Sequence, residues 1–523
     1  MARTPSYQAP FLLGIDFGTE SCRVGIFDVV GTPVAFASTP YPTTYPRHGW
    51  AEQQPAEWWS AMIASTRRAM AASGLQARDI VGIGFDATSA TIVALTENMT
   101  AIRPAIMWMD VRATAQAARF ADVTHEVRRY NGGGTKPATA EWYPFKAAWL
   151  KENEPETYSR ARWLLDAPDW LGLLLTGEAR VNLCSAAMKM YHDGNSGGWS
   201  QELYDVVGCG DVFEKLPEAT ASLGSPLGGL LPHVAEELGL LPGTPVGQGG
   251  IDAEAGQIGL NVLSPGRMAL ITGSSHVLLG QSADPVSGPG FFGAHTDAVV
   301  VGQYTVEAAQ ASSGSSINWL VREFAPEISA EARRSGLSPY EVMNMRSRNI
   351  PVGSEGLVIN EYLQGNRTPY TDSRARGIIS GLSLAHTVDH LYHAMQEAVC
   401  YGVEHNLRGM RESGYEVTQL VACGGALKGE DWMQMHADVT GVPITLTKVQ
   451  DAVALGSCIT AATGAGVYGS LQEAADAMVH EERVITPRAD VHEEYAWWVD
   501  RYVEQFPALR ATQHAVVDHE AAK

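Results

Sequence analysis

The sequence predicts an α/β protein with more than one domain. The chain has 523 residues, which is more than a single hydrophobic core usually organises. Short apolar runs alternate with longer stretches of helical periodicity, a pattern typical of alternating strands and helices. Each half also contains two apolar runs joined by a turn of glycine and hydroxyl residues, DFGTES at 16–21 and TGSSH at 272–276. These observations predict two α/β halves of similar design.

The first half begins with apolar runs at 11–15 and 24–29, which predict a hairpin whose backbone N–H groups can face an anion. Apolar side chains at helical spacing predict a helix at 56–72. The segment YNGGGTKP at 130–137 is expected to be a loop, because three consecutive glycines do not sustain a helix. The other elements expected in this half are strands at 80–85 and 105–109 and helices at 142–152 and 164–175.

The second half begins after a Gly/Pro-rich patch at 223–245, and we place the main boundary near Gly259. Small residues throughout 452–465 predict a helix packed closely on a neighbour, and the tail from residue 511 is expected to fray. The expected strands lie at 267–272, 299–306, 420–422 and 444–446. The expected helices lie at 313–324, 388–413, 430–441, 452–465, 470–480 and 493–510.

Composition excludes some classes of partner. A formal net charge of −21 argues against binding to nucleic acid or to an anionic membrane, but not against a phosphate ligand, which needs only local donors. The six cysteines are scattered without a CxxC pair, which is typical of reduced thiols. Neither a signal peptide nor an apolar run of membrane-spanning length is evident. We therefore expect a soluble, cytoplasmic protein.

The strongest candidate for chemistry is Asp252, in the sequence GGIDAEAGQIG at 249–259. A carboxylate on a glycine-flanked turn can accept a proton from a bound hydroxyl, and a nearby Thr-Gly-Ser-Ser loop can hold phosphate through N–H and hydroxyl donors. Either feature alone is common turn chemistry. Together they are the two parts that a phosphotransferase needs.

Seven motifs together resemble the successive signatures of the FGGY carbohydrate kinases, in the order of that family. They are DFGTES, W-x-D-x-R at 108–112, GGIDAEAGQIG, ITGSSH, GNRTP, ACGGALKGEDWMQMHAD and DAVALGSCITAA. The resemblance extends from about residue 12 to 470 and implies two actin-like (ribonuclease-H-like) ATPase domains of α/β fold with an interdomain cleft. It implies an N-terminal domain at 1–258 that binds sugar and carries the catalytic aspartate, a nucleotide-binding domain at 259–480, and C-terminal helices with a tail at 481–523.

The resemblance also implies the roles of single residues. Asp252 matches the general base that takes the proton of the sugar hydroxyl as it attacks the γ-phosphoryl group of ATP, and Asp16 matches the carboxylate near a magnesium ion, Mg²⁺, held partly through water. The residues matched to the γ-phosphate are Gly18, Thr19 and Glu20, and those matched to the β-phosphate are Thr272, Gly273 and Ser274. The residues matched to the rest of the nucleotide are Gly314, Asn318, Gly424, Gly425 and Ala426. His276, beside the second phosphate loop, is expected to be structural or to lie on the nucleotide side.

Local features of the sequence bear on which sugar is bound. Lys189 in CSAAMK and Glu307 in TVEAAQ are similar to substrate-binding positions of ribulokinase-like members. The alternative for both is an ordinary surface or domain-closing ion pair. Ser89, Trp108 and Asp110 would complete the pocket. These features favour a pentulose of the ribulose or xylulose type. A polyol such as ribitol, erythritol or glycerol is the alternative.

Two other classes remain open: an actin- or chaperone-like ATPase, and a catalytically inactive sensor. The first needs no sugar-facing residues, and the second needs no intact Asp16, Asp252 and phosphate loops. Consumption of ATP that depends on a sugar would separate the kinases from both. By family resemblance we expect a homodimer with a small-molecule sugar substrate.

Overall fold

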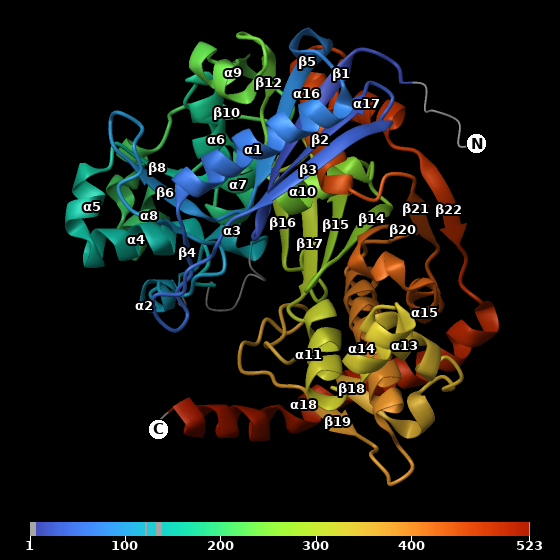
Figure 1. Cartoon of the computed structure of the whole chain (residues 1–523). Helices are drawn as coiled ribbons and strands as arrows, with labels where there is room; N and C mark the ends of the chain where they lie inside the picture. Colours follow the sequence, from blue (N-terminus) through green and yellow to red (C-terminus); the bar gives the residue numbers. More distant parts are fainter. Residues whose placement is uncertain (1–6, 121–122, 132–138, 522–523) are drawn as a thin grey trace.

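The computed structural model describes residues 7–120, 123–131 and 139–521 (Figure 1). The predicted loop at 130–137 therefore lies largely outside the described residues. Two seven-stranded sheets dominate the structure, one built from strands within residues 11–251 and the other from strands within residues 267–485. The predicted division at residues 258, 480 and 523 stays a prediction.

The first large sheet has the strand order β11-β12-β5-β1-β2-β3, with β13 also paired to β5. Its strands are β1 (Phe11–Phe17), β2 (Ser21–Asp28), β3 (Pro33–Pro40), β5 (Ile80–Ala87), β11 (Pro226–Gly229), β12 (Pro245–Gly247) and β13 (Gly250–Ile251). The hairpin predicted at its start is confirmed, and the neighbouring β1 and β5 run parallel. In this register Asp16 pairs with Asp86, and Asp86 also pairs with Gly250. Three chain segments therefore end at the same edge of the sheet.

The second large sheet has the order β16-β17-β15-β14-β20-β21-β22. Its strands are β14 (Arg267–Thr272), β15 (His276–Ser282), β16 (Gly293–Thr296), β17 (Tyr304–Gln310), β20 (Gln419–Gly424), β21 (Ile444–Thr447) and β22 (Glu481–Ile485). It repeats the plan of the first sheet, because the hairpin β14–β15 lies beside a parallel strand, β20.

Two helices join the sheets. Helix α10 (Asp252–Gly259) packs against α16 (Ala452–Gly464), and α16 also packs on β1 and β5, although it follows β21 of the other sheet. A Cβ atom added to Gly456 would lie 1.8 Å from the carbonyl oxygen of Ala255, so only glycine allows this approach. The prediction of a small-residue helix packed closely on a neighbour is confirmed.

The remaining elements cover the sheets and extend the first half (Figure 1). Helix α1 (Pro55–Ser73) packs on β2 and β3, and a four-stranded sheet of β4 (Glu52–Gln53), β7 (Ala105–Ile106), β6 (Ile92–Leu95) and β8 (Trp163–Asp166) lies in the same half. The main helices beside it are α3 (Glu126–Arg129), α4 (Tyr143–Asn153), α6 (Ala167–Thr176), α7 (Leu183–Lys189) and α8 (Gln201–Val207). Those of the second half are α11 (Gly314–Phe324), α14 (Val388–Glu412), α15 (Glu430–Thr440), α17 (Leu471–Met478) and α18 (Ala489–Ala521).

Two predicted elements of the first half are wrong in part. The helix expected at 164–175 is a buried strand, β8, followed by α6, because Asp166 ends the strand and accepts a hydrogen bond from the N–H of Ala167, which starts the helix. The strand expected at 105–109 ends at Ile106, since a turn closes with the N–H of Asp110 donating to the carbonyl of Met107.

Two predictions for the second half also need correction. The strand expected at 299–306 begins at Tyr304, because the chain reverses between Asp297 and Gly302, both of which have positive φ angles. The tail from residue 511 does not fray: it continues α18 to Ala521. His514 Nε2 lies 2.8 Å from Asp372 Oδ2, and Arg374 pairs with Asp518 at 3.1 Å. Contacts with the segment at 372–374 therefore hold this end of the helix.

Candidate active site

Three carboxylates meet where the first sheet ends. Asp16 lies near the end of β1 and Asp86 near the end of β5, directly opposite each other in the parallel pair. Asp252 follows β13 and is the first residue of α10, where the sequence predicts only a turn. Asp16 and Asp86 are buried, whereas Asp252 is partly exposed. The fold thus brings the predicted base and the predicted metal residue together.

Burial raises the pKa of both Asp16 and Asp86, and the negative charge of Asp252 adds to both shifts. The charge of Asp16 raises the pKa of Asp86 further. Arg23, whose Nη1 lies 3.4 Å from Asp16 Oδ2, opposes the shift of Asp16. Burial also raises the pKa of Asp252, to about 6, against the opposing effects of the Ala253 N–H and the charge of Lys189. The site therefore concentrates negative charge that a cation would relieve.

The chemistry of this donor set fits Mg²⁺. The hydroxyl of Ser457 donates to Asp86 Oδ2, but Asp86 Oδ1 is buried without a hydrogen-bond partner among the described residues. Mg²⁺ commonly binds one or two carboxylates and completes its shell with water and phosphate oxygens. Within residues 7–120, 123–131 and 139–521, no cluster of three or more His, Cys, Asp or Glu side chains could hold a metal alone. An ion held partly by phosphate and water is consistent with both findings.

Sequence reasoning missed Asp86, Arg23 and Asp451. Arg23 Nη1 lies 3.1 Å from Asp451 Oδ2, and Asp451 caps α16, so this arginine connects the first hairpin to the helix from the second half. Asp86 carried a usable signal, because it follows the buried run at 80–85 just as Asp16 follows the run at 11–15. Asp451 is the first residue of the motif DAVALGSCITAA, but the motif does not indicate its partner, which lies 428 residues away.

The residues predicted for the nucleotide are largely brought together at the second hairpin. Thr272 Oγ1 donates to the carbonyl of Cys423 (2.7 Å) and accepts from the N–H of Ala426 (3.1 Å). A Cβ atom on Gly424 would lie 2.1 Å from the carbonyl oxygen of Thr272. One on Gly314 would lie 2.3 Å from that of Gly273. The exposed residues of these turns are Gly273, Ser274, Gly424 and Gly425, with Asn318 exposed one turn into α11.

The first hairpin is supported by a tryptophan. The N–H of Gly18 donates to the carbonyl of Ser21 (3.1 Å), which closes the turn, and Glu20 is exposed. The indole Nε1 of Trp108 donates to Thr19 Oγ1 at 3.1 Å. Trp108 therefore connects the loop predicted to bind sugar with the loop predicted to bind the γ-phosphate.

His276 has a structural environment. It is buried, its Nδ1 lies 2.6 Å from the Ser313 hydroxyl, and its ring stacks on His436 at 5.5 Å. Burial lowers its pKa to about 3, so it is neutral at pH 7. It supports the second hairpin rather than supplying a proton.

Lys189 links the carboxylates predicted to bind sugar. Its Nζ lies 3.9 Å from Glu307 Oε2, and His295 Nε2 lies 3.6 Å from the same oxygen. Burial alone would raise the pKa of Glu307, but Lys189 and His295 hold it at about 2. Glu254 is a further residue that sequence reasoning missed. Burial raises its pKa to about 8, and the charge of Lys189 opposes this shift. Lys189 thus acts electrostatically on Asp252, Glu254 and Glu307 at once.

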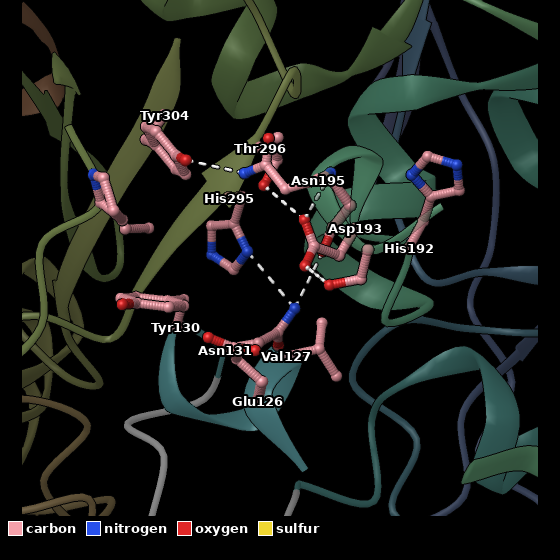
Figure 2. Close-up of a pocket in the computed structure, with 14 residues that line it drawn as sticks. Glu126, Val127, Tyr130, Asn131, His192, Asp193, Asn195, His295, Thr296 and Tyr304 are labelled. Carbon is pink, nitrogen blue, oxygen red and sulfur yellow. Dashed lines mark hydrogen bonds between the residues drawn. The ribbon is translucent and has the colours of Figure 1, made fainter. Parts of the chain in front are cut away.

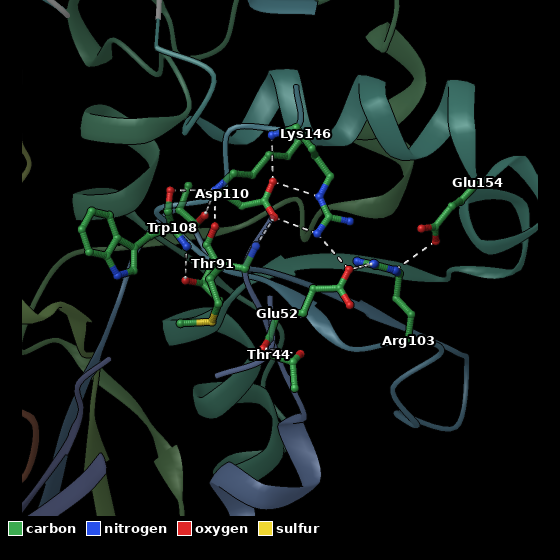
Figure 3. A network of polar contacts seen from close by, with 12 residues as sticks. Thr44, Glu52, Thr91, Arg103, Trp108, Asp110, Lys146 and Glu154 are labelled. Carbon is green, nitrogen blue, oxygen red and sulfur yellow. Dashed lines mark hydrogen bonds and ion pairs between the residues drawn. The ribbon is translucent and has the colours of Figure 1, made fainter. Parts of the chain in front are cut away.

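Ser89 and Asp110 already have protein partners. The Ser89 hydroxyl donates to Asp166. Asp110 is fully buried, and Arg112 donates to both of its oxygens, at 2.9 and 2.7 Å. The N–H of Ala51 donates to it as well, at 2.6 Å. Figure 3 shows this polar network extending to Glu52, Arg103 and Glu154. The sugar contacts predicted for Ser89 and Asp110 stay predictions, while their observed role is to fix the loop.

A buried lysine that sequence reasoning missed holds the same loop. Lys146 of α4 has no exposed surface, and its Nζ donates to the carbonyls of Ala90 (2.8 Å), Met107 (2.7 Å) and Trp108 (3.0 Å) (Figure 3). Burial lowers its pKa to about 7. It ties the segment after Ser89 to the segment of Trp108, which lie far apart in sequence.

Comparisons with known proteins agree with this geometry. The model of the N-terminal domain of the FGGY family of carbohydrate kinases matches residues 11–259, and that of the C-terminal domain matches residues 268–465. The xylulose kinase of Bacillus subtilis (strain 168) is 30% identical over 497 residues, which cover 94% of this chain and 96% of that protein. A ribulokinase of Bacillus licheniformis is 31% identical over 459 residues, which cover 83% and 82%.

A solved structure supports the same relationship. The crystal structure of a xylulose kinase from Rhodospirillum rubrum has a TM-score of 0.85 and 27% identity, covering 96% of this chain and all of that one. The predicted fold class, two actin-like α/β domains, is confirmed. Along the described part of the chain, no helix is both long and apolar enough to cross a membrane.

Proposed function

Because the chain belongs to the FGGY family of carbohydrate kinases, we propose that it transfers the γ-phosphoryl group of ATP to a pentulose of the ribulose or xylulose type. The observation that carries this proposal is the position of Lys189 among Asp252, Glu254 and Glu307. An open-chain ketose offers several neighbouring hydroxyls, which carboxylates and a lysine can bind in pairs. The similarity to proteins named xylulose kinase and ribulokinase supports the same class of substrate.

Asp252 acts as the general base in this proposal. A pKa of about 6 leaves its carboxylate ionised at pH 7 while keeping it more basic than an ordinary aspartate. It takes the proton from the sugar hydroxyl as the oxygen attacks phosphorus. Lys189 and Glu307 orient the sugar, so that the reacting hydroxyl rather than a neighbouring one faces Asp252.

The nucleotide lies along the two hairpins in this proposal. Backbone N–H groups and hydroxyls of the DFGTES turn face the γ-phosphate, and those of Thr272, Gly273 and Ser274 face the β-phosphate. Asp16 and Asp86 would hold Mg²⁺, which when bound neutralises charge on the transferring phosphoryl group. Closure of the two halves would exclude water and limit futile hydrolysis of ATP.

An ATP-consumption assay with magnesium tests the substrate class. The panel contains D- and L-ribulose, D- and L-xylulose, ribitol, erythritol and glycerol. We expect one pentulose to give the highest kcat/KM. If only a polyol supports turnover, the kinase assignment stands, but the pentulose proposal and the roles of Lys189 and Glu307 fail.

We also propose a cytoplasmic homodimer. All six cysteines are buried and free, which suits a reducing compartment. Light scattering during gel filtration should give twice the chain mass of 56.2 kDa. A mass equal to that of one chain would contradict the dimer.

A further inference from the structure

We propose that a cavity between the two halves is a second binding site, specific for an uncharged small molecule rich in hydroxyl groups. The cavity has a volume of about 280 Å³, close to the lower end of the ~300–1,000 Å³ typical of small-molecule sites. Its first wall comes from α3, Asn131 and the turn at 192–196, and its second from β16 and Tyr304 (Figure 2). This site is not among those implied for the sugar or the nucleotide.

The walls select against anions. None of the described residues lining the cavity is lysine or arginine, and two of them, Glu126 and Asp193, are acidic. Asp193 is already satisfied, because it accepts from the N–H of Asn195 (3.0 Å), from Ser196 Oγ (2.6 Å) and from Thr296 Oγ1 (3.1 Å). Among the described residues of these walls, a phosphate ester or a nucleotide would therefore meet negative charge and no lysine or arginine.

The other polar groups suit hydroxyls. They are amide, imidazole and hydroxyl groups, with the rings of Tyr130 and Tyr304 beside them. Burial lowers the pKa of His192, so its imidazole is neutral at pH 7. Neutral groups that donate and accept, together with aromatic faces, match the hydroxyls and C–H surfaces of a polyol or an open-chain sugar.

A buried acceptor in the wall has no hydrogen-bond partner among the described residues. Asn131 is 5% exposed, and its Nδ2 donates to the carbonyl of Ala187 (2.9 Å) and to His295 Nδ1 (3.4 Å). Its Oδ1 has no hydrogen-bond partner in the described part of the chain, and the same holds for Nδ1 of His192. Leaving such atoms unpaired costs stability, which a ligand hydroxyl would recover.

The cavity adjoins the sugar site through His295. The amide nitrogen of Asn131 can only donate, so Nδ1 of His295 accepts and its proton lies on Nε2. That nitrogen is 3.6 Å from Glu307 Oε2, too long for a direct hydrogen bond. At the rim, Asn195 Nδ2 donates to the Tyr304 hydroxyl (2.7 Å), which joins the two halves. A ligand in the cavity would therefore contact both halves and lie one side chain from Glu307.

Isothermal titration calorimetry on the full chain tests the proposal, with ribitol, erythritol, glycerol and D-ribulose as uncharged probes and ribulose 5-phosphate as the anionic comparison. Ser196→Trp fills the rim from an exposed position, and Glu202→Trp adds the same side chain on α8, outside the cavity. Asn131→Ala removes the hydrogen-bonding amide from the wall. Thermal unfolding of each variant shows whether it is folded.

We expect at least one uncharged probe to bind wild-type protein and Glu202→Trp at a site that Ser196→Trp abolishes, with at least ~10-fold weaker binding in Asn131→Ala. For a probe that is also the substrate, wild type should bind two equivalents and Ser196→Trp one. If no uncharged probe loses a site in Ser196→Trp, or if the sugar phosphate binds there more tightly, the proposal is overturned. Calorimetry measures binding in the absence of ATP turnover. A failure of the proposed kinase reaction would appear in the ATP-consumption assay and not in this titration.

Discussion

The nucleotide side and the sugar side of the cleft are built by different means. On the nucleotide side, the turn at Thr272, Gly273 and Ser274 meets Gly424 through backbone atoms, and glycine is required where a Cβ would lie 2.1 Å from a carbonyl oxygen. On the sugar side, the charge of Lys189 on α7 acts on Asp252 of α10 and on the buried Glu307 of β17, so charged groups from separate elements are brought together.

This difference explains what each side contributes. Backbone donors at exposed turns can hold any nucleoside triphosphate by its phosphates, so they give the reaction its phosphoryl donor. Buried charges have strong mutual effects and are costly to leave unpaired, so they discriminate between acceptors. Substitutions on the two sides should therefore change different kinetic constants.

The largest expected effect is that of Asp252→Asn. Loss of the general base should lower kcat by ~10²–10⁴-fold, while sugar binding measured by calorimetry changes little. The matched control is Glu254→Gln. Because the pKa of Glu254 is raised to about 8, a neutral amide resembles its protonated state at pH 7, and kcat should stay within about tenfold. A loss smaller than tenfold in Asp252→Asn would mean that Asp252 is not the base.

Lys146→Met should destabilise the sugar side. The substitution leaves the buried carbonyls of Ala90, Met107 and Trp108 without their shared donor, at a cost of about 3 kcal/mol or more, and should lower the Tm and raise the sugar KM. Lys151→Met, at an exposed ion pair with Asp211, should change stability by less than about 1 kcal/mol. Equal Tm values for the two variants would show that Lys146 does not hold the loop.

Glu307→Ala should raise the sugar KM selectively. Removing one partner of a buried charge pair costs about 2 kcal/mol or more, which is roughly 30-fold in KM. The KM for ATP should change less than about twofold, because the charged partners of Glu307, Lys189 and His295, are not among the residues predicted to bind the nucleotide. Steady-state kinetics with each substrate varied in turn measures both constants. Equal increases in both would instead indicate a residue that closes the two halves.

A pair of neighbouring glycines tests the nucleotide side. Gly424→Ala forces a side chain against the carbonyl of Thr272 at a position with φ of +99°, a strain of about 1–3 kcal/mol. The KM for ATP should rise and the KM for sugar should not. Gly425→Ala has its nearest protein contact at 3.9 Å and should leave the Tm unchanged, whereas Gly424→Ala should lower it. Similar effects of both substitutions would contradict the close approach that the structure shows.

As pH rises through the pKa of Asp252, activity should increase while the contribution of Asp252 to folding stability should decrease. Because the base must be ionised, kcat/KM should fall about tenfold per pH unit below about 6. For folding, a pKa raised from 3.8 to about 6 means that the native state keeps this proton longer than the unfolded state. The contribution of Asp252 to stability therefore decreases as pH rises from about 4 to 6. An activity that rises on acidification through this range would exclude an ionised Asp252 as the base.

The sequence could predict the nucleotide side better than the sugar side, for physical reasons. The turn at 272–276 and the glycines at 424–425 can be recognised from the local sequence alone. Turn geometry and a close approach of two backbone segments restrict which residue types fit there. Lys146 cannot be found this way: its three acceptors lie 38 to 56 residues away and are backbone atoms. Strand β8 was missed because its apolar run continues directly into α6.

The central claim is that this cleft couples ATP consumption to a sugar. The most direct test is the rate of ADP formation by the wild-type protein with magnesium, in the presence and in the absence of the pentulose that responds best. We expect an increase of at least ~10²-fold on adding the sugar, with one sugar phosphate formed per ADP. An equal rate without sugar would identify an ATPase whose cleft serves another purpose and would contradict the coupling.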